Sequence, residues 1–144
     1  MTLQVALAML QREGRWLLQL RDDIPGIVAP GMWGLFGGHL ELGEAPEQAL
    51  RRELLEEIGW QPDRLRPWFR HADSRRIAHF FHGPLLVPLS GLHLQEGQDM
   101  ALASLDELRR GAVWSPRLGQ NRALAESLGW AVAQLQRQPL PPQG

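Results

Sequence analysis

Residues 46–58, PEQALRRELLEEI, place the strongest limit on how this chain can fold. At about 100° per residue, Leu50, Leu54 and Ile58 fall on one side of a helix, which is typical of an amphipathic helix packed on a core. The segment opens with proline, which suits a first helical position, and Gly59 follows it, where glycine commonly ends a helix. The pattern predicts a helix over 46–58 with its leucines facing the interior.

Three glutamates, Glu53, Glu56 and Glu57, lie within about 100° of one another on this predicted helix, beside the leucine face. Like charges three or four residues apart destabilise an isolated helix by about 0.2–0.5 kcal/mol per pair, and Arg52 offsets only part of this. A solvated acidic surface is the alternative interpretation. A hard divalent cation balances the charge better, since Mg²⁺ prefers oxygen ligands and bridges carboxylates to phosphates. The cluster therefore predicts a metal and phosphate site.

The rest of the chain alternates between short apolar runs and turn residues, which predicts a mixed sheet covered by helices on both faces. A long loop with two prolines and two glycines, 22–31, interrupts the strands. The expected elements are a hairpin of 5–10 and 16–21, strands over 65–71 and 75–82 with an extension at 85–89, a strand over 100–103, a capping box at 104–107 that opens a short helix, and a helical apolar pattern over 117–136.

Composition limits the partners and the compartment. A length of 144 residues suits one domain, and a net charge of −1 offers no broad basic field for nucleic acid or an anionic membrane. Cysteine is absent, which excludes disulfides and a cysteine nucleophile. The apolar run 5–10 lacks a basic flank and is too short for a signal core or a membrane span. We expect a soluble, cytoplasmic protein without a membrane partner.

The spacing of the glycines and glutamates resembles the box of the Nudix hydrolases, G-x5-E-x7-R-E-U-x-E-E-x-G-U, where U is a bulky apolar residue. Its defined positions are filled here by Gly38, Glu44, Arg52, Glu53, Leu54, Glu56, Glu57, Gly59 and Trp60. Trp60 stands where an aliphatic residue is usual, and Phe36 stands where proline often precedes the glycines. These departures leave the substrate subfamily unassigned. We expect one Nudix domain over 1–137, its box at 38–60, and a flexible tail over 138–144.

The resemblance implies an α/β/α sandwich that uses Mg²⁺ or Mn²⁺ to cleave a nucleoside diphosphate linked to another group X. Glu56 and Glu57 would be the main metal ligands, and Glu53 a ligand or the general base. Arg52 would orient Glu53, and Glu44 would complete the polar network. The further candidates for the metal are the backbone carbonyl of Gly38 or Gly37 and, in a later loop, Glu96.

Substrate recognition is expected outside the metal ligands. Arg21 offers a bidentate contact to phosphate, although a surface arginine is the alternative. Several aromatic residues are candidates for stacking on a base, with a place in the core as the alternative: Trp33, Phe36, Phe80, Phe81 and Trp114. Asn121 would bind a base edge or cap a helix, and Gly37 would lie near the phosphates.

Three functions fit the box, and a small-molecule pyrophosphohydrolase, acting as a monomer or homodimer, is the leading one. The second is a nucleotide-sensing module of the same fold without turnover, which an incomplete box would favour. The third is an RNA-end pyrophosphohydrolase, which would require a basic surface that the net charge of −1 disfavours.

Overall fold

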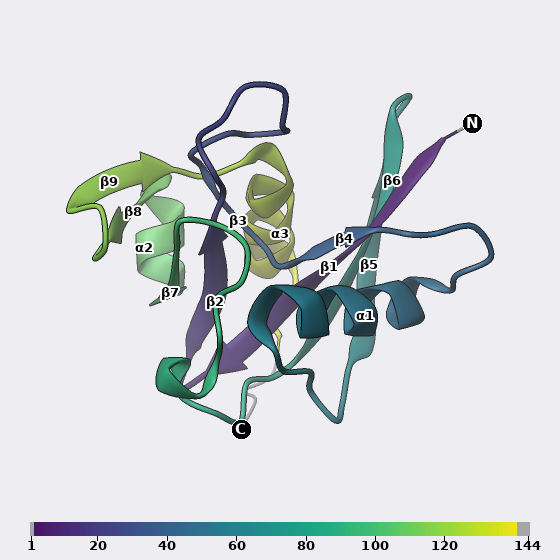
Figure 1. Ribbon diagram of the computed structural model, residues 1–144, viewed down its shortest axis with the longest axis horizontal. Helices are drawn as coiled ribbons and strands as arrows, with labels where there is room; N and C mark the ends of the chain where they lie inside the picture. The colour runs from purple at the N-terminus through teal and green to yellow at the C-terminus, as the bar shows by residue number, and fades with distance from the viewer. Residues whose placement is uncertain (1, 141–144) are drawn as a thin grey trace.

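Two helical layers enclose a seven-stranded mixed sheet in the computed structural model, which describes residues 2–140 (Figure 1). Strands β3, β2, β1, β6 and β5 follow one another in that order, β4 adds to β1, and β7 adds to β2. The β1–β6 pair is parallel and the other pairs are antiparallel. The elements are β1 (Leu3–Arg12), β2 (Arg15–Leu20), β3 (Trp33–Gly34), β4 (Gly37–His39), α1 (Pro46–Ile58), β5 (Arg66–Ala72), β6 (Arg76–Pro84), a 3₁₀ turn (Leu89–Gly91), β7 (Asp99–Ala103), α2 (Leu105–Arg109), β8 (Ala112–Ser115), β9 (Gln120–Ala123) and α3 (Glu126–Arg137).

Alternation along the central strand β1 divides the core into two clusters, one on each face of the sheet. Val5, Leu7 and Met9 join the cluster that contains the buried side chains of α3. Ala6 and Leu10 join the cluster that contains the leucines of α1. Figure 1 shows α1 and α3 on opposite sides of the sheet. The predicted α/β/α sandwich with a mixed sheet is confirmed.

Helix α1 has the predicted bounds. Leu50, Leu54 and Ile58 are fully buried, whereas Leu55, at the edge of the apolar face, is 47 % exposed. Gly59 ends the helix in the left-handed conformation, with φ of +66°. Ala45 at the N-cap accepts no hydrogen bond through its side chain, so the helix gains its stability from packing.

Leu54→Ala is expected to lower the free energy of unfolding by about 2–5 kcal/mol, because it leaves a cavity under α1 where the wild-type side chain is fully buried. Urea denaturation measures the change. Leu55→Ala is the matched control, since it removes the same atoms from a half-exposed position next to it. Equal losses in the two variants would contradict the proposed packing of this face.

Two of the predicted elements are wrong. Residues 85–89 form no strand: the Leu85 amide still donates to the Gln11 carbonyl (2.8 Å), but Pro84 and Pro88 have no N–H with which to continue a ladder. The helix predicted over 117–136 begins only at Glu126, because 112–115 and 120–123 pair as a β-hairpin. The spacing of apolar residues suggests a helix, but Leu118 packs on the core from a turn and Leu124 from a strand end.

The turn between β8 and β9 is held by the buried carboxylate of Asp99. Its Oδ2 accepts hydrogen bonds from Ser115 Oγ (2.7 Å) and from the Arg117 amide (3.2 Å). These long-range bonds favour a turn where the local sequence favours a helix. The other predicted strands and the short helix with its capping box, Ser104 to Glu107, are confirmed.

Leu140, within the predicted tail, packs against the α3-side cluster, and 141–144 lie outside the described residues. Among residues 2–140 there is no helix long and apolar enough to cross a bilayer.

Candidate metal centre

Three carboxylates converge beside the C-terminal half of α1. Glu53 and Glu57 lie one turn apart on the helix, and Glu96 comes from the loop before β7; one oxygen of each lies within 4.8 Å of the others. The loop is held against the helix end by the Gln95 amide, which donates to the Glu57 carbonyl (2.8 Å). A set of clustered carboxylate oxygens fits a hard divalent cation such as Mg²⁺ or Mn²⁺.

Glu57 is the most buried of these ligand candidates, with 3 % of the residue exposed. Its Oε1 accepts a hydrogen bond from the Gly37 amide (2.8 Å), which links the helix to β4. Burial, together with the neighbouring Glu96 carboxylate, raises the pKa of Glu57 to about 9. A cation at this position would favour the ionised form instead, since an opposite charge within a few ångströms stabilises the carboxylate. The buried carboxyl is therefore suited to a site that binds positive charge.

Glu53 lies directly over the backbone of Gly38. A Cβ at Gly38 would stand 2.5 Å from the Glu53 carboxyl carbon, so only glycine leaves room for this arrangement. The side chain of Glu53 is 17 % exposed, and burial raises its pKa, although Arg52 acts in the opposite direction. Gly38 also pairs with Ala6 of β1, which fixes this strand beside the helix.

Gly38→Ala is expected to displace the Glu53 carboxylate and to weaken divalent cation binding by about 10-fold or more, as displaced supporting groups commonly do at metal sites. Calorimetric titration with Mn²⁺ measures the affinity. Gly129→Ala on α3 is the control for a glycine away from the carboxylates, because its backbone is helical and a Cβ there would meet no atom within 4 Å. Unchanged Mn²⁺ affinity in Gly38→Ala would contradict the proposed close approach.

Arg52 holds the polar side of the helix in place. Its Nε and Nη2 donate to the two carboxylate oxygens of Glu44 (2.8 and 2.9 Å), and its Nη1 donates to Glu53 Oε1 (3.0 Å). A fourth contact runs from Nη2 to the His39 carbonyl (3.1 Å). The Arg52 guanidinium lowers the pKa of Glu44 to about 2. The Arg52 guanidinium thus lies between Glu44 and Glu53 and donates to both.

Glu56 is separate from the group of three carboxylates. Its side chain is 60 % exposed, and one carboxylate oxygen lies 3.5 Å from Arg52 Nη1. The sequence assigns Glu56 and Glu57 as the main ligands, whereas the structure brings Glu57 together with Glu53 and Glu96. The role of Glu56 as a ligand stays a prediction.

The residues proposed to bind substrate lie in different surroundings. Arg21 donates through Nε to the Val28 carbonyl (2.7 Å), which ties it to the loop before β3. Trp33 and Phe36 are 0 % and 1 % exposed. Their stacking on a base is therefore corrected to a place in the core, where Trp33 Nε1 donates to the Val113 carbonyl (2.9 Å). Gly37 donates to Glu57 as described above, so its amide lies at the carboxylate group itself.

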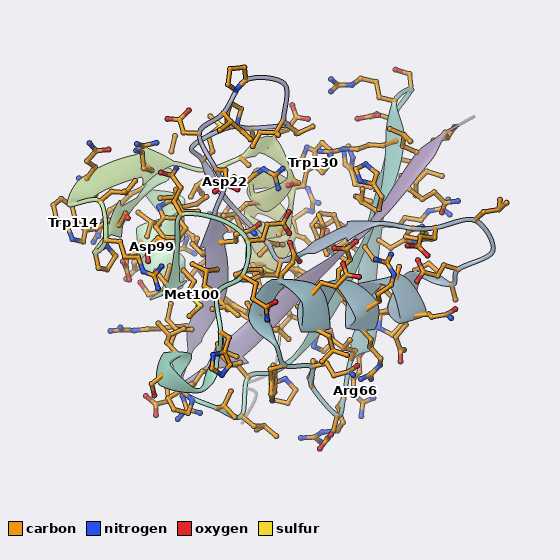
Figure 2. All side chains as sticks on the ribbon, viewed as in Figure 1. Asp22, Arg66, Asp99, Met100, Trp114 and Trp130 are labelled. Carbon is orange, nitrogen blue, oxygen red and sulfur yellow. The ribbon has the colours of Figure 1, made fainter. Side chains whose placement is uncertain are left out.

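Asn121 lies in β9, so its predicted role as a helix cap is wrong. It lines a cavity of about 330 Å³ whose wall includes Arg110 and Trp114. Figure 2 shows Trp114 at the outer end of the β8–β9 hairpin, and 53 % of this residue is exposed. Trp114 keeps the exposure that a stacking residue needs, whereas Trp33 and Phe36 do not.

Gln19 also lies beside these carboxylates, a position that the spacing of the box does not predict. It is 2 % exposed on β2, and its Nε2 donates to the Glu96 carbonyl (3.1 Å) and lies 3.5 Å from Glu57 Oε2. The available signal is an amide that interrupts the apolar run WLLQL. The sequence does not show which groups this amide bonds, because Glu57 and Glu96 come close to it only in the folded protein.

The fold and the carboxylate group define a Nudix domain, and comparison with known proteins agrees. The chain matches the NUDIX domain family model over residues 2–121. The chain therefore belongs to the Nudix family of hydrolases. Nucleoside triphosphatase NudI of Escherichia coli is 42 % identical over 69 residues, which are 46 % of this chain and 48 % of that protein. The chain spans about half the length of the curated relatives it matches.

Solved structures show the same fold at lower identity. The MutT Nudix hydrolase of Burkholderia pseudomallei has a TM-score of 0.71 and 22 % identity, covering 94 % of this chain and 98 % of that chain. The NUDIX domain of Shewanella oneidensis NrtR, solved in complex with ADP ribose, has a TM-score of 0.71 and 19 % identity, covering 97 % and 90 %. Both likenesses concern the fold.

Proposed function

We propose that this protein is a pyrophosphohydrolase that depends on Mg²⁺ or Mn²⁺ and cleaves a nucleoside diphosphate linked to another group X. The observation that carries the proposal is the convergence of Glu53, Glu57 and Glu96, with ligand atoms within 4.8 Å of one another. Glu57 and Glu96, with the backbone carbonyl of Gly38, would hold the cation, and Glu53 would be a further ligand or the general base. When bound, the cation would neutralise the diphosphate oxygens and lower the pKa of a water molecule.

Glu53 suits the part of general base in this reaction. Its carboxylate accepts a hydrogen bond from Arg52 Nη1 (3.0 Å), so its orientation is held, and burial raises its pKa above the ordinary value. Arg52 is itself fixed by the two bonds to Glu44. In this assignment Glu53 removes the proton from the attacking water, while Glu57 and Glu96 remain ligands.

A small molecule is the substrate that the charge of the chain favours, since a net charge of −1 gives no extended basic surface for nucleic acid. Arg21 is the proposed phosphate contact, and Asn121 remains a proposed contact to a base. NudI is named as a nucleoside triphosphatase, and the NrtR domain was solved with ADP ribose, so both compound classes belong in a substrate search. We also propose a cytoplasmic location for the protein.

Product analysis across a panel of nucleotides tests the function. The panel contains nucleoside triphosphates, oxidised nucleotides, ADP ribose, nucleotide sugars and dinucleoside polyphosphates, each incubated with and without Mg²⁺. Release of a nucleotide product only when Mg²⁺ is present is the expected result. If no compound is cleaved although ADP ribose or a nucleotide binds, the protein is a sensor and the enzymatic proposal fails.

A further inference from the structure

A buried amide connects the metal-binding helix to the loop that carries the third carboxylate. Gln19 lies on β2, distant in sequence from both, and is 2 % exposed. A side-chain amide nitrogen has two hydrogens to donate. Gln19 Nε2 uses one on the Glu96 carbonyl (3.1 Å) and faces Glu57 Oε2 at 3.5 Å. The same nitrogen therefore lies between the backbone of Glu96 and the carboxylate of Glu57.

The loop is built to approach this amide closely. Gly97 has φ of +100°, and a Cβ there would stand 3.0 Å from Gln19 Cγ and 2.8 Å from the Leu20 carbonyl. On the far side of the glycine, the Gln98 amide donates to the same Leu20 carbonyl (2.8 Å). The loop is thus fastened to β2 by backbone bonds, and the Gln19 side chain fits directly beneath Gly97.

The Gly37 amide holds one oxygen of the Glu57 carboxylate, Oε1 (2.8 Å). Gln19 Nε2 faces the other oxygen, Oε2, at 3.5 Å. Burial of an amide is unfavourable unless its hydrogens are bonded, so an apolar residue would serve packing at this position better. A buried amide at position 19 is therefore better explained by the hydrogen bonds that it donates than by packing.

We propose that Gln19 is a positioning residue that sets the distance and orientation between the Glu57 and Glu96 carboxylates for divalent cation binding. It does not touch the cation in this role, because its amide nitrogen donates and does not coordinate. The inference rests on the proposed metal site, and it adds a supporting residue from β2 to the box and the later loop. Supporting groups of this kind commonly change metal affinity by about 10–100-fold.

Direct Mn²⁺ binding, measured by electron paramagnetic resonance without any nucleotide, tests the inference. Gln19→Met keeps the length of the side chain and removes the donor, and Gln19→Asn keeps the amide but shortens its reach. Both are expected to bind Mn²⁺ about 10-fold or more weakly than the wild type. Gln11→Met is the matched control, because Gln11 is a buried glutamine (7 % exposed) on β1, whose side chain lies on the α3 side of the sheet with Met9. It is expected to keep the wild-type affinity.

Amide hydrogen exchange of the metal-free protein separates positioning from general destabilisation. The amides of Gln95 and Gln98 should exchange faster in Gln19→Met, with amides in β5 and β6 unchanged. Wild-type Mn²⁺ affinity in both Gln19 variants would overturn the inference, as would an equal loss in Gln11→Met. Mn²⁺ binding that depends on Gln19 in a protein that cleaves no nucleotide would contradict the proposed function alone, whereas the absence of Mn²⁺ binding to the wild type would overturn both.

Discussion

Glu53→Gln is expected to lower turnover by about 10²–10⁴-fold with little change in the fold, because an amide of the same shape cannot accept the proton from water. Glu53 contacts Arg52 Nη1 (3.0 Å) and lies over Gly38, so the substitution removes the charge without opening a cavity. Steady-state rates at saturating Mg²⁺ measure the effect, and thermal melting confirms that the variant folds. Glu47→Gln, which changes an exposed glutamate on the same helix, is the control.

The same assay tests Glu56, which the sequence assigns as a main ligand. Glu56→Gln is expected to lose most turnover if the exposed carboxylate turns toward a bound cation. A near-normal rate in either Glu53→Gln or Glu56→Gln would remove the role assigned to that residue.

Glu57→Gln is expected to remove the loss of stability at rising pH that Glu57 causes and to weaken the stabilisation of the protein by Mg²⁺. Without a cation, the folded-state pKa of Glu57 is about 9, against an ordinary value of 4.5. Between pH 4.5 and about 9, Glu57 is therefore protonated in the folded state and ionised in the unfolded state. The free energy of unfolding of the wild type should therefore fall as the pH rises through this window, by up to about 1.4 kcal/mol per pH unit from this group. Glu57→Gln removes this contribution.

Denaturation at about pH 8, with and without Mg²⁺, measures both effects of Glu57→Gln. At this pH the wild type has lost most of the stability that Glu57 loses between its unfolded-state and folded-state pKa values. The metal-free variant should be more stable than the wild type, because it buries no carboxyl that resists ionisation. Excess Mg²⁺ should stabilise the wild type more than the variant, since a ligand stabilises the state that binds it and the variant has lost one of its ligands. Equal stabilisation of wild type and variant by Mg²⁺ would show that Glu57 is not a ligand.

The spacing of residues in the sequence predicts the structure correctly where the interactions are local. The bounds of α1 and the buried face of Leu50, Leu54 and Ile58 follow from residues within a few turns of one helix. Helical periodicity places such residues on known faces, whatever the rest of the chain does. The capping box at Ser104 is local for the same reason.

The spacing of residues predicts the structure wrongly where contacts with segments distant in sequence determine it. Leu118 and Leu124 match a helical pattern, yet the Asp99 carboxylate stabilises a turn at Ser115 and the chain forms a hairpin. Trp33 and Phe36 are ordinary candidates for stacking until the sheet and its two helical layers close over them. A short apolar segment has no unique preference, and tertiary packing selects its structure.

By itself, the sequence determined the family resemblance, the sandwich fold and the helix that carries Glu53 and Glu57. Only the tertiary structure decided which carboxylate completes the group: it brought in Glu96 and left Glu56 exposed. It also placed Gln19 against both Glu57 and the Glu96 backbone. The physical reason is that ligands on one helix share a local geometry, whereas the contacts between β2, the helix end and the loop at Gly97 exist only after the sheet has formed.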